Sequence, residues 1–502
     1  MVNRRIVFAV CVAGLTLLAD PSEAQSLRIG LAEDPDTLDP TLSRTFVSGV
    51  VRAALCDRLF DIGLELEIVP QLATEWKWTD DRMGLVVKLR RGVKFHDGEP
   101  FDAAAVKYNI ERYLTTPGST RKRDIGAITS VEVVDDDTAK LVLSAPFAPL
   151  LSKLAGPAGT MVSPKAALAE GENFGSRPIC AGPFKFVERK AQDRIVVERF
   201  GDYWDKDKVK LDRIVFLPIP DTTVRLANLQ SGGLDLVAVA ASDLETVRKD
   251  PRLKLAVVNG LGYSGITINV ANGERSKLPL GQDARVRQAL ELSIDREALN
   301  QVVFNGEFEP GNQWVSPVNP YYIKQLQIPT RDVGKAKALL AAAGAPNPVV
   351  ALTATNNPVV LQTAQVVQAM AKEAGFDIRI QASEFASALQ HTAEGDFEAF
   401  MVGWTGSVDP DGNIYNLVTC NSPFNDGHYC NPEVDRELDA ARTLDTPADR
   451  LAHYRIAAEH VLQDLPIIYL YHPKWLYAHT AKLSGFTPYP DGVIRPQGLQ
   501  LK

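Results

Sequence analysis

A histidine and an aspartate stand side by side in the stretch VKFHDGEPF, residues 93–101. An imidazole beside a carboxylate can move protons in catalysis, but only with a nucleophile and oxyanion donors in the same cleft. The sequence contains no G-x-S-x-G or H-E-x-x-H motif. Asp97-Gly98 is instead a typical turn dipeptide, and His96 ends the strand before it. We therefore expect a backbone turn here, no catalytic residue and no enzyme.

The remaining histidines are potential metal ligands, but they are scattered along the chain. Two of them, His453 and His460, are two turns apart on one expected helix, a spacing more typical of a polar helix face than of a metal site. The others are His391, His428, His472 and His479. We expect no bound metal and no cofactor.

Two loops carry side chains suited to binding a small polar solute. One contains Arg44, Thr45 and Phe46, of which Arg44 can pair with a ligand carboxylate. The other contains Trp404, an apolar wall with one N–H donor, and Asp409, which can accept an ammonium. Between these two residues lie Thr405, Gly406 and Ser407. Gly403 and Gly406 permit a close approach of the backbone.

Each of these candidates also has a structural interpretation. Trp404 is a candidate core residue, and Arg44 a candidate solvated surface residue. Asp409 begins the sequence DPDGN, which is typical of a turn that caps a helix. These alternatives stay open at the level of sequence.

Hydrophobic periodicity indicates the elements that position both loops. Alternating residues predict a hairpin across 75–95, and apolar runs predict strands at 27–31, 349–352, 376–380, 398–402 and 466–471. Helical spacing and caps predict helices at 46–55, from 102, and at 283–293, 296–304, 335–343 and 361–374. The strand-helix-strand order over 349–380 is a βαβ crossover. Both loops follow a predicted strand, where open α/β sheets bind ligands.

The cysteines predict two disulfides. Cys420 and Cys430 flank a turn-rich stretch and are expected to pair locally. Cys56 and Cys180 then remain, and we pair them by elimination. An even number of cysteines in the mature chain suits an oxidising compartment.

The start of the chain predicts export. Arg4 and Arg5 precede the apolar run 6–18, and Ser22-Glu23-Ala24 is a cleavage signal, so residues 1–24 form a signal peptide cleaved near Ala24. The 502-residue chain has a net charge of −8, which argues against nucleic acid or anionic lipid as a partner. No later run of apolar residues is long enough to be embedded in a membrane.

Several ordered blocks resemble the extracellular solute-binding proteins, family 5, of ABC importers, a class with peptide, dipeptide and nickel binders. The likeness runs from about Leu27 to the end. The most specific block is LATEWKWTDDRMGLVVKLRRGVKFHDGEPFDAAAVKYNIER, and the others are AGPFKFVER, GDYW, LANLQSGGLDL, DARVRQALELSIDREAL, GWTGSVDPDGN and NPEVDRELDAAR.

This resemblance implies an α/β fold of the periplasmic-binding-protein type, class C and type II-like. Two ligand-binding lobes and an extra domain would close on a ligand like a trap. Lobe I would combine residues 25–60, 183–266 and 476–502, the extra domain would be 61–182, and lobe III would be 267–475. The chain would cross between the lobes near Ser264-Gly265 and Trp475-Leu476, which are candidate hinges.

The resemblance also implies that both candidate loops contact the ligand, with one departure. Peptide-binding members place an aspartate directly after the Trp-x-small triplet, where it binds the peptide amino terminus, and this sequence has Ser407 there. Either Asp409 substitutes for it, or the ligand lacks a free amine at that place. A standard dipeptide is therefore disfavoured, and a longer peptide, glutathione or an opine-like compound stays open.

The implied function is that of a periplasmic, monomeric binding protein. It would capture a short peptide or peptide-like solute and deliver it to an inner-membrane ABC permease. The nickel or metallophore binder of the same fold is the alternative.

Overall fold

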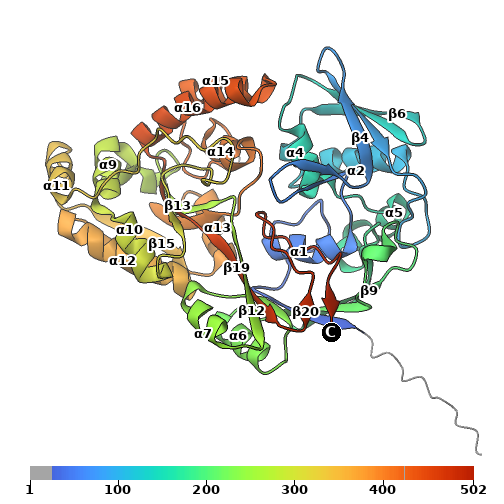
Figure 1. The fold of residues 1–502 in the computed structure, drawn as a ribbon. Coiled ribbons are helices and arrows are strands. Elements are labelled where there is room, and N and C mark those ends of the chain that lie inside the picture. The colour runs from blue at the N-terminus through green and yellow to red at the C-terminus, as the bar shows by residue number, and fades with distance from the viewer. Residues whose placement is uncertain (1–24, 423) are drawn as a thin grey trace, which may run out of the picture.

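The protein is described by a computed structural model over residues 25–422 and 424–502. The predicted signal peptide, residues 1–24, lies outside the described residues. Two large sheets and one smaller antiparallel sheet organise the chain, each with helices packed against it (Figure 1). Within the described part of the chain, no helix combines the length and the apolar character needed to cross a bilayer.

The first large sheet has seven strands in the order β12-β19-β11-β1-β10-β9-β8. Its strand β1 lies parallel to both β10 and β11, and leads into the loop that carries Arg44. The strands are β1 (Ser26–Leu31), β8 (Phe184–Lys190), β9 (Arg194–Arg199), β10 (Arg213–Pro218), β11 (Leu236–Ala238), β12 (Leu253–Asn259) and β19 (Lys474–Thr480). The accompanying helices are α1 (Phe46–Leu55), α6 (Thr222–Gln230) and α7 (Leu244–Lys249).

The second large sheet has six strands in the order β14-β18-β13-β17-β15-β16. The strands are β13 (Tyr263–Ile268), β14 (Glu309–Pro310), β15 (Val349–Thr355), β16 (Asp377–Ser383), β17 (Ala399–Trp404) and β18 (Ile467–His472). The helices around it are α8 (Pro279–Gln282), α9 (Ala284–Ser293), α10 (Arg296–Phe304), α11 (Val333–Ala342), α12 (Pro358–Ala374), α13 (Phe385–Ala393), α14 (Asp411–Val418), α15 (Pro432–Thr443) and α16 (Pro447–Asp464).

The predicted βαβ crossover is confirmed, with different boundaries. Strands β15 and β16 are parallel and flank α12. Helix α12 begins three residues before the predicted start, because the Asn357 side chain caps it by accepting the Val359 amide at 2.9 Å. An asparagine cap followed by proline at the first helical position is a recognised start signal. Strand β17 extends to Trp404, so the tryptophan ends a strand instead of lying in the loop.

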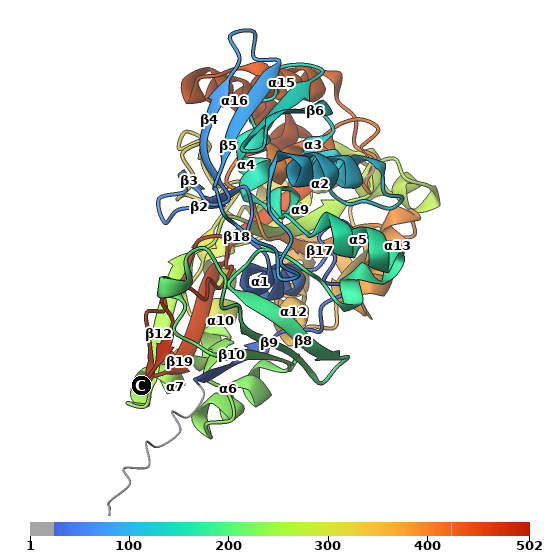
Figure 2. The same ribbon diagram turned by 90° about the vertical axis from the view of Figure 1, so that its right-hand side faces the viewer.

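The smaller sheet has the order β4-β5-β7-β6 and includes the predicted tryptophan hairpin. Figure 2 shows α1 between this sheet above and the seven-stranded sheet below. The strands of the smaller sheet are β4 (Ala73–Trp78), β5 (Gly84–Leu89), β6 (Ile128–Asp135) and β7 (Thr138–Leu143). The helices beside it are α2 (Ala103–Thr115), α3 (Lys122–Ile125), α4 (Leu150–Ala155) and α5 (Pro164–Glu170). Two short pairs complete the strands, β2 (Phe60–Ile62) with β3 (Ile68–Pro70), and β20 (Leu483–Ser484) with β21 (Gln500–Leu501).

The His-Asp-Gly motif forms the predicted turn. Gly98 has a φ of +86°, a conformation that glycine adopts without steric cost. The Cys180 amide donates to His96 Nδ1 at 3.3 Å, and His96 Nε2 lies 3.1 Å from the Gly182 carbonyl oxygen. Burial lowers the pKa of His96 to about 4, so the ring is neutral and both of its nitrogens are used. The motif therefore joins two chain segments.

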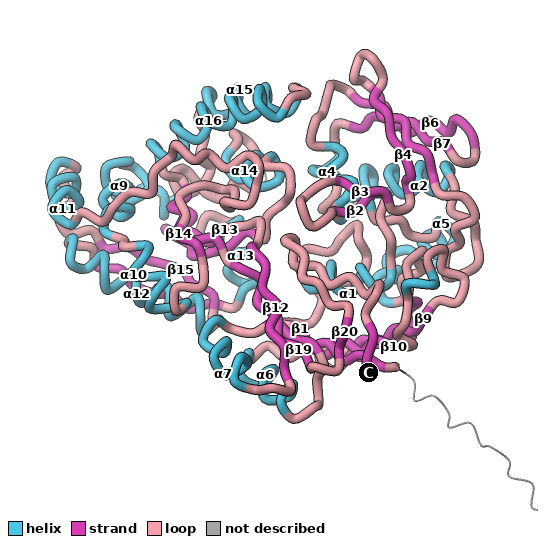
Figure 3. The backbone as a smooth tube through the Cα atoms, viewed as in Figure 1, coloured by secondary structure: helices cyan, strands magenta, loops and turns pink. Residues whose placement is uncertain are grey.

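The chain passes between the large sheets at two places. Strand β12 ends at Asn259 and β13 begins at Tyr263, so the first crossing is the segment 260–262. Strands β18 and β19 are separated only by Pro473. The predicted crossings, Ser264-Gly265 and Trp475-Leu476, lie inside hydrogen-bonded strands. We call the part built on the seven-stranded and smaller sheets the first body, and the part built on the six-stranded sheet the second body. Figure 3 shows the strands running through the junction between them.

Both predicted disulfide pairings are present. Cys56 follows α1 and bonds Cys180, with a Cα–Cα distance of 4.9 Å. Cys420 bonds Cys430 across ten positions of sequence, with a Cα–Cα distance of 4.5 Å. The first bond joins the end of α1 to the segment that the His-Asp-Gly turn contacts.

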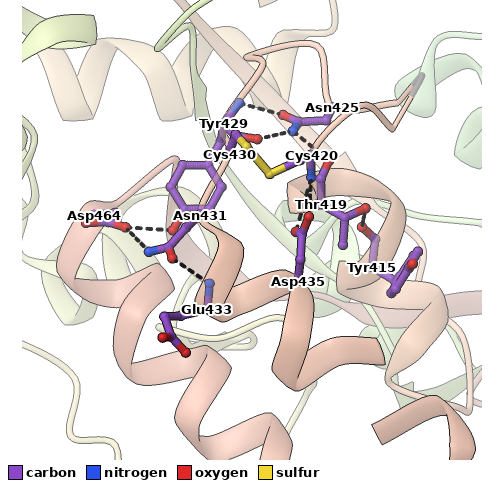
Figure 4. Close-up of a disulfide and its surroundings, with 10 residues drawn as sticks. All are labelled: Tyr415, Thr419, Cys420, Asn425, Tyr429, Cys430, Asn431, Glu433, Asp435 and Asp464. Atoms are coloured by element: carbon purple, nitrogen blue, oxygen red, sulfur yellow. Dashed lines mark hydrogen bonds between the residues drawn. A yellow bond between two sulfur atoms is a disulfide. The ribbon is translucent and has the colours of Figure 1, made fainter. Parts of the chain in front are cut away.

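Hydrogen bonds organise the loop inside the second disulfide (Figure 4). Asn425 Nδ2 donates to the Thr419 carbonyl at 3.1 Å, and the Tyr429 amide donates to Asn425 Oδ1 at 3.0 Å. The Tyr429 hydroxyl donates to Asp464 Oδ2 at 2.6 Å. The loop is therefore anchored to the end of α16, and it holds Phe424 at the surface.

Candidate ligand-binding site

One cleft gathers most of the predicted binding residues. It has a volume of about 500 Å³ and receives residues from α1, from the α3–α4 region of the smaller sheet, and from the chain after β17. Small-molecule pockets usually measure roughly 300–1,000 Å³. Of the predicted ligand-binding residues, seven line it: Arg44, Thr45, Phe46, Trp404, Thr405, Gly406 and Ser407.

Asp36 shapes the first wall of the cleft. It accepts hydrogen bonds from the Arg44 amide at 2.7 Å, from Thr45 Oγ1 at 2.9 Å and from Ser48 Oγ at 2.6 Å. Although burial acts in the opposite direction, these bonds hold the pKa of Asp36 below its usual value. The carboxylate therefore fixes the loop between β1 and α1, and sets where Arg44 leaves the backbone.

Phe46 and Arg44 differ in their surroundings. The Phe46 ring stacks on Trp475, with centroids 4.7 Å apart and planes inclined by 16°. It therefore links α1 to the strand that leaves the second crossing. The Arg44 side chain is exposed and forms no ion pair with any residue that the structure describes. Its charge is available to a ligand.

Trp404 has an unused donor. The residue ends β17, opposite Tyr263 of β13, and its ring is partly buried. Its Nε1 atom is buried and has no hydrogen-bond partner within the described residues. A buried N–H without an acceptor is costly, and most such groups in proteins find one. A ligand acceptor in the cleft would satisfy it.

The close backbone approach at Gly406 serves the fold. Gly406 has a φ of +89°, and a Cβ there would lie 2.4 Å from the Leu261 carbonyl carbon. A Cβ at Gly262 would in turn lie 1.7 Å from the Trp404 carbonyl oxygen. The glycines thus let the chain after β17 pack on the first crossing. Gly406 also lines the cleft, and its close approach to a ligand backbone stays a prediction.

Asp409 lies outside the cleft lining in the described structure, apart from the other predicted binding residues. Its carboxylate forms a bidentate pair with Arg450, at 2.7 Å and 2.8 Å. This partner comes from α16 and occupies the oxygens that were expected to accept an ammonium. Ser407 does line the cleft, and its amide donates to Asn413 Oδ1 at 2.6 Å.

The prediction missed the cationic residues of the cleft. Arg52 lies on the face of α1 that also carries Phe46 and Gly49, so helical spacing could have identified it. The others come from the smaller-sheet region or border it: Arg58, Arg121, Arg123 and Lys153. With Arg44, six cationic side chains line the cleft, against three carboxylates: Glu33, Asp124 and Asp491.

Four of these cations form what we call the arginine cluster: Arg44, Arg52, Arg121 and Arg123. Arg52 is 5% exposed, and its Nη1 donates to Ser43 Oγ at 2.5 Å. Burial, and then the charge of Arg121, lower the pKa of Arg52 to about 10. Arg121 pairs with Asp124 at 3.0 Å, and Arg123 lies 3.5 Å from the same carboxylate.

A second group, which we call the ionic ring, consists of Arg58, Asp61, Arg495 and Asp491. Arg495 lies 2.7 Å from Asp61 and 2.9 Å from Asp491, and Arg58 also pairs with Asp61. Although burial disfavours its charge, the two arginines keep the pKa of Asp61 below its usual value. The ring therefore contains equal numbers of positive and negative groups.

Contacts across the cleft join the two bodies. Lys153 of α4 pairs with Asp411 of α14 at 3.2 Å, and Arg442 of α15 pairs with the same carboxylate at 2.5 Å. Despite burial, these two cations hold the pKa of Asp411 below its usual value. Arg123 also lies 3.9 Å over the ring of Phe424, which the disulfide-bonded loop presents. The α3–α4 region therefore contacts the second body at two places across the cleft.

The described residues contain no group of three or more histidine, cysteine, aspartate or glutamate side chains placed to hold a metal ion. His453 bonds Glu437, with its Nδ1 2.6 Å from a carboxylate oxygen, as expected for a polar helix face.

Two α/β bodies, joined where the chain passes between them at 260–262 and at Pro473, enclose a ligand-sized cleft. This arrangement defines a periplasmic binding protein. The family of bacterial extracellular solute-binding proteins, family 5 middle, matches residues 67–426, and the chain belongs to this family. It is thus a solute-binding protein of ABC transporters and not an enzyme.

Among curated proteins, the chain is 30% identical to the glutathione-binding protein GsiB of Pectobacterium atrosepticum, over 98% of this chain and 97% of that protein. Among solved structures, AgaA of A. tumefaciens R10, in complex with agropinic acid, matches with a TM-score of 0.85 and 27% identity, over 95% of this chain and 99% of that chain. The oligopeptide-binding protein AppA of Bacillus subtilis, in complex with a nonapeptide, gives 0.84 and 26%, over 95% and 99%.

Proposed function

We propose that the protein is the periplasmic receptor of an ABC importer. It captures a short peptide or peptide-like solute between its two bodies, and delivers it unaltered to an inner-membrane permease. The observation that carries this proposal is the buried Trp404 indole N–H, which lines a cleft of about 500 Å³ and lacks an acceptor among the described residues. A peptide carbonyl or carboxylate oxygen supplies that acceptor.

The solute binds without placing an amine beside Ser407. Asp409 is committed to Arg450, so it does not replace the missing carboxylate. This favours a modified or acidic peptide over a standard dipeptide. Two similar proteins support this preference, because one binds glutathione and the other agropinic acid, and both solutes are acidic and derived from amino acids.

The organisation and location of the protein belong to the same proposal. With the crossings at 260–262 and Pro473, one lobe comprises residues 25–60, 183–259 and 474–502, the other comprises 263–472, and 61–182 is the extra domain. The mature chain, cleaved near Ala24, acts as a monomer in the periplasm. Two disulfides fit an oxidising compartment.

The experiment is mass spectrometry of small molecules released by denaturing protein purified from its native host. We expect a peptide or peptide-like compound, whose binding is then measured by titration calorimetry. Trp404→Phe serves as a matched variant, since it keeps an aromatic ring but removes the N–H. Recovery of a metal chelate, or binding that is equal in Trp404→Phe and the parent protein, would contradict the proposal.

A further inference from the structure

The arginine cluster carries more positive charge than the protein neutralises. Its four guanidinium groups face two carboxylates, Asp36 and Asp124. Asp36 gives its oxygens to an amide and two hydroxyls of its own loop, and forms no ion pair within the described residues. The neighbouring Asp39 is occupied by Arg112, whose Nη2 lies 2.6 Å from it. Glu33 also lines the cleft, but its neighbours are the carboxylates Asp36 and Glu384, and burial with their charges raises its pKa. The four arginines and their two facing carboxylates therefore leave an excess of two positive charges.

Arg52 is the least compensated member of the cluster. It lines the cleft and is 5% exposed, yet no carboxylate of the described residues pairs with it. Its single hydrogen bond goes to a neutral hydroxyl, Ser43 Oγ. Arg121 shares that serine, because its Nη2 donates to the Ser43 carbonyl at 3.1 Å. Arg121 is 6% exposed, so both cations are buried. Two like charges side by side in buried positions repel each other, and an anion between them is strongly favoured.

The start of α1 adds to this positive potential. The helix has ten residues, its first turn receives no side-chain cap, and Thr45 and Phe46 at its start line the cleft. The N-terminus of a helix carries a partial positive charge and unpaired N–H groups, both of which favour anions. The helix and Arg52 therefore act on the same side of the cleft.

We propose that the arginine cluster binds two carboxylate groups of the transported solute, with one of them against Arg52. The solute class is then a peptide-like acid with at least two carboxylates. This inference rests on the proposed function and narrows its ligand. A guanidinium suits a carboxylate because its planar N–H groups match the two oxygens. A peptide with a single carboxylate leaves half of the excess charge unneutralised.

The test uses the full mature chain, purified from its host. Released solutes are methyl-esterified, and the number of esters added to each counts its carboxylates. We expect at least two esters on the principal solute. The absence of any such acid among the released solutes would overturn the inference. Release of a peptide with one carboxylate would do so while leaving the proposed function intact, whereas release of a metal chelate would contradict the proposed function itself.

Calorimetry with glutathione and its diethyl ester identifies the residues. We expect the parent protein to bind glutathione at least ~30-fold more tightly than the diester, and Arg52→Gln to remove most of that preference, since truncating one partner of a buried charge pair costs on the order of 30-fold or more. Arg331→Gln is the matched control, because Arg331 pairs with Glu373 at 3.0 Å, away from the cleft lining. Equal binding of acid and diester, or equal effects of the two substitutions, would refute the assignment.

The ligand-free melting temperature separates a binding role from a structural one. Because Arg52→Gln removes a repulsive charge and no ion pair, we expect it to keep or raise this temperature. A fall that matches its loss of binding would show that Arg52 acts only by supporting the fold.

Discussion

The cleft brings together two arginine-rich groups that differ in one respect. In the ionic ring, Arg58 and Arg495 are matched by Asp61 and Asp491. In the arginine cluster, four guanidinium groups share two carboxylates, and Arg52 pairs with neither. The positive and negative charges of the ring balance within the protein, whereas those of the cluster balance only when an anion is added.

This difference extends to other polar groups near the cleft. Asp409 is satisfied by Arg450, and both ring nitrogens of His96 have partners. The Trp404 indole N–H has none among the described residues. A residue whose bonds are all internal supports the fold, while one with an unused bond facing the cleft is a candidate for recognition. Trp404 and Asp409 belong to one sequence block, yet only Trp404 has an unused hydrogen-bonding group.

The largest effect is expected from breaking the ring. Arg495→Met leaves Asp491 without its guanidinium in a mostly buried site, which should lower the free energy of unfolding by about 3–5 kcal/mol. Arg52→Met is the counterpart. It loses the bond to Ser43 but also relieves the repulsion from Arg121, so its net destabilisation should be at most about 1 kcal/mol. Urea denaturation of the ligand-free proteins measures both. The comparison fails if the two variants are destabilised equally.

The next effect concerns Trp404 and appears in binding. Trp404→Ala removes both the apolar wall and the unpaired donor, so it should weaken solute binding by at least ~100-fold, as for other buried aromatic anchors. Titration calorimetry with the solute released from the native protein gives the affinity. An affinity within a few-fold of the parent would place the solute elsewhere.

Lys153→Met should have a smaller effect, because Asp411 keeps Arg442 at 2.5 Å. The Lys153–Asp411 pair joins the two bodies, so its loss removes a contact that holds the cleft shut. We expect affinity to fall roughly thirtyfold, about 2 kcal/mol, with faster release of the solute in stopped-flow experiments. Faster capture with unchanged release would argue against a role in closure.

The smallest effect on binding is expected at His96. His96→Ala should leave affinity unchanged, because the ring bonds only the segment around Cys180. Stability should respond to pH instead. Burial lowers the pKa of His96 to about 4, below its unfolded value of about 6.5, so its contribution is complete above pH ~6.5 and is lost as the pH falls toward ~4.

Urea denaturation at two pH values checks this expectation. Between pH ~7 and pH ~5 the parent protein should lose about 2 kcal/mol more stability than His96→Ala, the linkage expected for this pKa difference. An identical pH dependence in both proteins would show that His96 is not held neutral.

Much of the scaffold could be predicted from the sequence, because its signals are local. Helix α1 has the predicted bounds, the Asp97-Gly98 turn is where its dipeptide indicates, and the βαβ unit follows from periodicity. The observed crossings lie a few residues before the predicted ones. The packing at the first crossing depends on contacts of Gly262 and Gly406 with segments distant in sequence, which no local pattern indicates.

The site was only partly predictable for the same reason. Arg52 shares a helix face with Phe46, so helical spacing alone could have identified it as a cleft residue. The pairing of Asp409 with Arg450 joins the bend before α14 to helix α16 across 41 positions of sequence, and no local pattern indicates it. Charge balance in a cleft depends on which partners the fold brings together.

The most direct test of the account is a crystal structure of the protein with the solute that it carries from its native host. The account predicts one intact solute between the two bodies, with an acceptor on Trp404 Nε1 and a carboxylate on Arg52. A chemically altered solute, or one bound away from both side chains, would contradict it.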